Sequence, residues 1–232
     1  MDESVVPEVS VQEPCVEKGA VPEPAVQRAG GRGRSAGATA LIETAVAVAV
    51  VSLLLGAATF LAQGLLPDPL RPLANSASGW TLLTVLVVQL ARARPLPSAV
   101  LGAVGFVALV LGYAIAADVR GLFYSPVLFG VVGILVGPFV GVATSWLRST
   151  GWRAALGAGA LAGVALGECV YGLVVVSDTT GWFYWVLIGV AGVALLGVTL
   201  VRRAGRGVVA LGGVGVALAV AGAFFVAYSG LG

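Results

Sequence analysis

Glu168 is the one acidic side chain placed well inside a long apolar run of this sequence, so it is the first candidate for chemistry. The run covers residues 152–176 and is long enough to cross a bilayer. A carboxylate at mid-bilayer costs about 2.5–3.5 kcal/mol on insertion scales, so it must be paired, protonated or facing water. Tyr171 follows three residues later, on the same helical face, and could donate a hydrogen bond to it.

Other polar side chains are expected in the same outer half of the protein. They are Gln63, Asn75 and Tyr113, which with Glu168 and Tyr171 form the candidate polar site. Two interpretations stay open. Glu168 either transfers protons or binds a solute, as intramembrane acids commonly do, or it is a neutral acid that fixes the register of its helix.

The residue types exclude several chemistries. Histidine is absent, so there is no histidine general base, no histidine-type zinc site and no axial histidine for haem. Lys18 is the only lysine and lies near the amino terminus, which excludes a retinal Schiff base within a span. No phosphate-binding glycine loop or catalytic triad is evident. We therefore expect no cofactor, no metal site and no catalytic residue, and an enzyme is the less favoured class.

The elements that must position these residues are membrane-spanning helices. Hydrophobic residues make up 59% of the 232 residues and charged residues 10%, against about 25% charged in average domains. Apolar runs predict an all-α, polytopic transmembrane helix bundle of about seven spans. The expected spans are about 40–62, 77–91, 97–117, 125–147, 153–176, 182–201 and 207–229. Residues 1–37, rich in acids and prolines, are expected to be a disordered cytoplasmic tail, and residues 38–232 the transmembrane domain.

The basic residues give the expected orientation. With seven spans, all 13 except Arg71 and Arg120 fall on the side of the amino terminus. Positive residues collect in cytoplasmic loops, which predicts the amino terminus inside and the carboxyl terminus outside. The bias toward Ala, Gly, Val and Arg is typical of a GC-rich bacterial genome, so the expected location is the bacterial plasma membrane. The net charge of +2 argues against nucleic acid as a partner. The expected partner is the lipid bilayer.

The second span is the weakest, because its apolar core is short and residues 74–79 would be needed to complete the crossing. The preceding loop contains Pro67, Pro69 and Pro72, which preclude a regular helix through it. Asn75, Ser76 or Ser78 could cap the second span.

Two glycine stripes predict close helix packing. Gly133, Gly137 and Gly141 recur every fourth residue in the fourth span, as Gly159, Gly163 and Gly167 do in the fifth. Small residues at this spacing let two backbones approach, and a short connection makes these spans neighbours. We expect the two stripes to pack against each other.

Several short motifs also resemble a known family. They are Gln-Gly-Leu-Leu-Pro at 63–67, Leu-Ala-Asn-Ser at 73–76 with Trp80, and Leu-Gly-Glu at 166–168 with Tyr171. They resemble a domain of unknown function found in multi-pass membrane proteins of high-GC Gram-positive, actinobacterial-type bacteria. The resemblance implies the fold over about residues 45–230 and no mechanism. Two functions stay open: passage or sensing of a small solute or proton through an outward-facing pocket at Glu168, or a non-catalytic membrane scaffold that binds a partner protein.

Overall fold

The computed structural model describes residues 29–205 and 207–230, with side chains from residue 39 onward. The helices are α1 (Ala29–Leu65), η2 (Asp68–Asn75), α2 (Ala77–Ala91), α3 (Pro95–Val119), α4 (Val127–Trp146), α5 (Trp152–Tyr171), η3 (Gly172–Val176), α6 (Ser177–Thr180), α7 (Phe183–Thr199), η4 (Leu200–Ala204) and α8 (Val208–Ser229). No strand occurs in these residues, and the expected all-α fold is confirmed.

The chain divides into two compact units at Ala38 and Thr39, inside α1. Of the segment expected to be a tail, residues 1–28 lie outside the described residues, and residues 29–37 form the first turns of α1. The site and its supporting helices all belong to residues 39–232.

Six helical segments are long and apolar enough to cross a membrane: Thr39–Leu65, Pro95–Val119, Val127–Trp146, Trp152–Thr180, Phe183–Ala204 and Val208–Ser229. They agree closely with six of the expected spans. A further bent pair, in which η2 meets α2 at 62°, is long and apolar enough when its two helices are taken together. The protein is therefore a polytopic membrane protein with six helices able to cross the bilayer, or seven crossings if the bent pair counts as one.

The structure corrects one part of the expectation for the second span, whose bounds of 77–91 match α2. Residues 77–79 form the first turn of α2, whereas residues 74–76 do not extend it outward, because the chain turns at Ser76, whose backbone is extended with φ −119° and ψ 154°. The prolines do prevent an α-helix before it, yet residues 68–75 still form the tighter 3₁₀-helix η2. Gly79 makes the bend possible, since a Cβ there would lie 2.0 Å from the carbonyl oxygen of Leu73.

Three connections that were expected on the same side do lie together. The guanidinium of Arg148, after α4, donates to Gln89 in α2 and to the carbonyl oxygen of Ala93, at 2.5 Å. Arg203 at the end of η4 donates to the carbonyl oxygen of Leu147 at 3.0 Å. Arginines thus satisfy carbonyl groups at helix carboxyl ends, where positive charge is favourable. The contacts bring the carboxyl ends of α2, α4 and η4 together, as the seven-span arrangement predicts.

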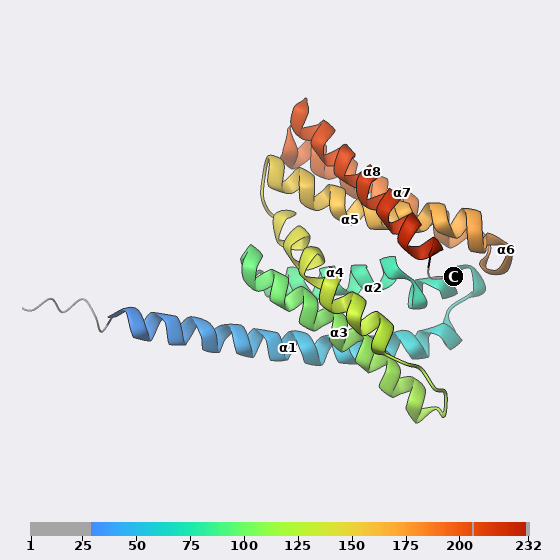
Figure 1. The fold of residues 1–232 in the computed structure, drawn as a ribbon, viewed down its shortest axis with the longest axis horizontal. Coiled ribbons are helices and arrows are strands. Elements are labelled where there is room, and N and C mark those ends of the chain that lie inside the picture. The colour runs from blue at the N-terminus through green and yellow to red at the C-terminus, as the bar shows by residue number, and fades with distance from the viewer. Residues whose placement is uncertain (1–28, 206, 231–232) are drawn as a thin grey trace, which may run out of the picture. The chain divides into compact units, whose positions relative to one another are not determined.

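Figure 1 shows α5, α7 and α8 side by side, and α3 beside α4. The first group encloses a small-residue core of Ala158, Ala162, Leu196 and Ala217. A second core joins α2 and α3 through Trp80, Phe106, Val110 and Tyr113. Many large apolar side chains on the outer faces stay exposed, among them Leu90, Phe139 and Leu211, as lipid-facing surfaces require.

The six stripe glycines all lie at helix contacts, but the expected pairing of the two stripes is wrong. The α4 stripe packs on α3: a Cβ on Gly141 would lie 1.9 Å from the carbonyl oxygen of Ser98. The α5 stripe packs on α8: a Cβ on Gly163 would lie 2.7 Å from the carbonyl oxygen of Ala217. Gly157 makes the α4–α5 contact instead, beside Ala143 and Trp146. A glycine stripe therefore predicts that another helix packs closely against it, but it does not predict which helix.

The packing predicts how two glycines of α4 differ. Gly141→Ala should destabilise the protein by about 1–3 kcal/mol, because the added methyl group overlaps the backbone of α3. Gly130→Ala is the matched control, since nothing lies within 4 Å of its Cβ position. It should be neutral or slightly stabilising, as alanine is the better helix former. Thermal unfolding in detergent compares the two, and equal stability would contradict the α3–α4 contact.

The orientation predicts labelling from opposite sides. In a protein with Cys15 and Cys169 replaced by serine, Ser229→Cys should react with a membrane-impermeant maleimide on intact cells. Leu96→Cys, at the start of α3 with 80% of its surface exposed, should react only after permeabilisation. Reaction of both from the same side would refute the five crossings that separate them, those of α3, α4, α5, α7 and α8.

Candidate functional site at the bent crossing

The amino terminus of α2 is held by a carboxylate from another helix. Glu168 in α5 accepts hydrogen bonds from the backbone N–H of Ala77 at 2.8 Å and of Ser78 at 2.6 Å, one on each oxygen. The side chain of Ser76 accepts from the next N–H, that of Gly79, at 2.9 Å. The first three N–H groups of α2, which have no partner within their own helix, are therefore all satisfied.

Electrostatics favours this arrangement. The amino end of a helix bears roughly half a positive charge, and a carboxylate is stabilised there. Hydrogen bonds to an ionised acceptor are also stronger than neutral ones. Glu168 is only 3% exposed, so these contacts act away from bulk water. Glu168 is thus the cap of α2, a role that its position within α5 alone does not indicate.

A second polar contact fixes the same bend from α7. The hydroxyls of Ser76 and Tyr184 are hydrogen bonded at 2.5 Å, and both residues are buried. Ser76 therefore joins α7 to the first turn of α2, while Glu168 joins α5 to it. The expectation that Ser76 could cap the second span is confirmed, whereas the role of Tyr184 was missed. Its place just after Trp182, near a span end, was the only available indication.

An open cavity of about 1280 Å³ reaches this cap. Four of the five residues of the candidate polar site line it: Gln63, Asn75, Glu168 and Tyr171. The fifth, Tyr113, is buried and accepts a hydrogen bond from the Gln63 side-chain amide at 2.9 Å. The structure thus brings together residues that lie far apart in the sequence.

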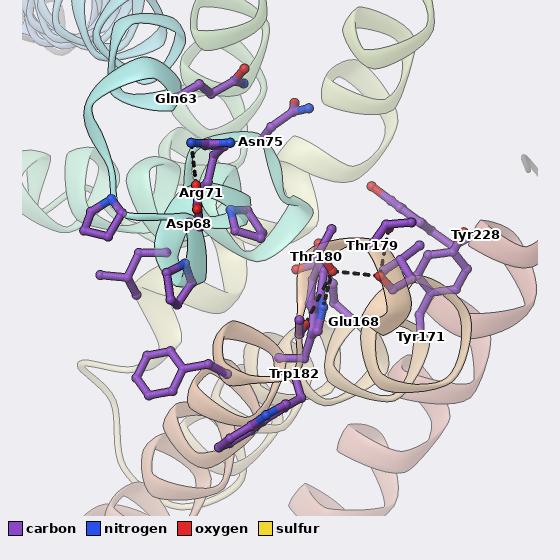
Figure 2. Close-up of a pocket in the computed structure, with 18 residues that line it drawn as sticks. Gln63, Asp68, Arg71, Asn75, Glu168, Tyr171, Thr179, Thr180, Trp182 and Tyr228 are labelled. Carbon is purple, nitrogen blue, oxygen red and sulfur yellow. Dashed lines mark hydrogen bonds and ion pairs between the residues drawn. The ribbon is translucent and has the colours of Figure 1, made fainter.

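Tyr171 differs from the expectation. Among the hydrogen bonds of the described residues, none joins it to Glu168, whose bonds go to backbone N–H groups instead. Its ring contacts Tyr228 of α8, with centroids 5.4 Å apart at 73°. Figure 2 shows Tyr171 and Tyr228 next to each other in the cavity lining, together with Glu168.

Residues that sequence reasoning did not nominate complete the lining. Asp68 and Arg71 of η2 form an ion pair at 2.6 Å, drawn in Figure 2. Thr180 accepts a hydrogen bond from the indole N–H of Trp185 at 2.9 Å. The remaining members include Thr179, Trp182, Phe183 and Tyr228. These side chains come from η2, α6, α7 and α8 and from the connection before α7, which no local pattern connects.

An aromatic cluster supports the Gln63 side of the site. Tyr113 contacts Phe60, Trp80 and Tyr124, with its ring centroid 4.8 Å from that of Tyr124. Tyr124 lies in the connection before α4, where burial and then the neighbouring Tyr113 raise its pKa to about 12. Its phenol is therefore neutral at physiological pH, and the cluster adds no charge to the site.

Comparison with known proteins places the chain in a family. Residues 35–232 match the family of unknown function DUF6518. The chain belongs to this family. No curated protein and no solved structure matches it. The expectation of a family of unknown function is confirmed, and the match covers every residue of the polar site.

The cap predicts graded effects at Glu168. Glu168→Ala leaves the N–H groups of Ala77 and Ser78 without their acceptor. The free energy of unfolding should fall by about 1–3 kcal/mol for each of these buried groups. Glu168→Gln keeps one acceptor oxygen and should be intermediate. Hydrogen exchange should rise first in the opening turn of α2. Glu43→Gln, on an exposed position of α1, is the control and should change neither the free energy of unfolding nor the hydrogen exchange of α2. Wild-type protection in Glu168→Ala would exclude the capping role.

Proposed function

We propose that the protein passes or senses a small solute or proton through the cavity at Glu168, which opens to the outer side of the membrane. The main observation in support is that the cavity reaches a buried carboxylate at a helix end that lies within the membrane. A packed bundle would need the carboxylate only as a helix cap and would not need the cavity that reaches it.

The length of α2 supports an amino end that lies inside the bilayer. Its 15 residues extend about 22 Å, whereas the hydrocarbon core is about 30 Å thick. If its carboxyl end, where Arg148 bonds to Gln89, lies at the inner surface, α2 starts roughly 8 Å below the outer boundary. Non-helical backbone at that depth is tolerated only where protein buries it or where it lines a water-filled cavity.

Broken helices of this kind form the binding sites of many transporters, where half-helix ends point at the bound solute. Here the positive end of α2 faces the protein's own carboxylate. Each Glu168 oxygen accepts one backbone N–H, and an ionised carboxyl group can accept about four hydrogen bonds in all. Because Glu168 lines the cavity and its oxygens can accept further hydrogen bonds, it can interact there with a proton or a solute.

The proposal includes the side to which the cavity opens and the membrane in which the protein lies. The cavity lies at the end opposite to Arg148 and Arg203, and the excess of basic residues at that other end supports an outward opening. The residue bias and the family resemblance support the plasma membrane of a high-GC Gram-positive, actinobacterial-type bacterium.

The proposal predicts that water reaches the cavity from outside. Asn75→Cys, in a protein with Cys15 and Cys169 replaced by serine, should react with an impermeant maleimide on intact cells as fast as Ser229→Cys. Leu111→Cys, on the exposed apolar face of α3, is the control and should stay unlabelled because it faces lipid. A water-soluble carbodiimide should also modify Glu168 from the outside, as detected by mass spectrometry.

Protection of both Asn75→Cys and Glu168 would overturn the proposal. A cavity closed to outside water favours the other function class, a membrane scaffold that binds a partner protein, in which Glu168 serves only as the cap of α2.

A further inference from the structure

We propose that the cavity binds an organic monocation of the alkylammonium class, with its charged head between the Glu168 carboxylate and the rings of Tyr171 and Tyr228. The inference rests on the proposed function and names the class of solute for that site.

The charge of the cavity favours a cation. Its lining contains three charged side chains, Asp68, Arg71 and Glu168. Asp68 and Arg71 neutralise each other in their ion pair, which leaves Glu168. The end of α2 offsets only about half of that charge. A buried negative charge with low-dielectric walls attracts positive solutes and repels anions. An anion would also compete with Glu168 for the same backbone N–H groups.

The aromatic lining favours an organic cation. Tyr171 and Tyr228 meet edge to face, and Figure 2 shows both with Glu168 in the cavity lining. Trp182 and Phe183 add two further rings nearer the surface, where they are 63% and 46% exposed. Ring faces attract alkylammonium heads, and clusters of aromatic side chains are a recurrent way to bind them.

The alternatives fit less well. A divalent metal ion prefers several oxygen ligands, and among the described residues no group of three acidic, histidine or cysteine side chains could hold one. A cavity of about 1280 Å³ accommodates a solute of many atoms, far larger than a bare ion. The lining is mostly apolar carbon, which suits alkyl groups better than a sugar.

The test uses the full-length protein in detergent micelles and two probes of the same shape. One is choline. The other is its neutral carbon isostere, in which a tert-butyl group replaces the trimethylammonium head. Calorimetric titration at constant ionic strength should give binding for choline and at least tenfold weaker binding for the isostere, because only the former interacts with the carboxylate and the ring faces.

Variants locate the binding. Tyr228→Leu should weaken choline binding by about 2- to 30-fold, the range of one cation–π contact, while Tyr228→Phe retains most of it. Trp182→Leu should have a smaller effect in the same direction, and its exposed position makes misfolding no concern. Phe123→Leu is the matched control: it is 93% exposed, lies outside the cavity and should bind choline normally. Glu168→Gln should abolish binding.

Equal affinity for the two probes, or no choline binding at millimolar concentration, would overturn the inference. So would choline binding that neither Tyr228→Leu nor Trp182→Leu weakens. These outcomes leave the proposed function intact if Asn75→Cys is labelled from outside. Protection of both Asn75→Cys and Glu168 from the outside reagents would instead refute the proposed function itself.

Discussion

The structure depends on one constraint, that backbone N–H groups inside a membrane must find acceptors. In the proposed placement, α2 begins below the outer boundary of the bilayer, where each unsatisfied group costs several kcal/mol. Glu168 supplies acceptors for Ala77 and Ser78, and Ser76 supplies one for Gly79. The carboxylate that is costly in a span and the helix end that is costly in a span therefore stabilise each other.

This pairing explains why the chain can break its second crossing. The 62° bend between η2 and α2 requires an extended residue at Ser76 and a glycine at position 79, where the carbonyl of Leu73 leaves no room for a side chain. The bend carries η2 over the first turn of α2 and opens the cavity between η2, α5 and α6. Glu168 thus has two roles that are physically linked, because the same carboxylate that caps α2 forms part of the cavity wall.

The glycines decide how the surrounding helices are arranged. In a bilayer no hydrophobic force drives helices together, so close backbone contact provides the attraction. Gly56 of α1 and Gly112 of α3 meet the carbonyl oxygens of Leu109 and Leu53, where a Cβ would lie only 2.0 Å away. The α3–α4 and α5–α8 contacts also depend on glycines that let the two backbones approach closely. Three pairs of helices packed through glycine give a rigid frame that positions the polar residues at one end.

The sequence by itself determined which segments are apolar enough to span a membrane, that the second span is the weakest, and that Glu168 must have a partner. These follow from segment length, prolines and the cost of a buried charge, which are local properties. Only the tertiary structure decided that the partner of Glu168 is the backbone of α2, that the glycine stripes of α4 and α5 face α3 and α8, and that Tyr228 and Tyr184 join the site. The reason is physical. A helix stripe or an intramembrane acid defines what kind of contact is needed, whereas the identity of the partner depends on which helices lie side by side.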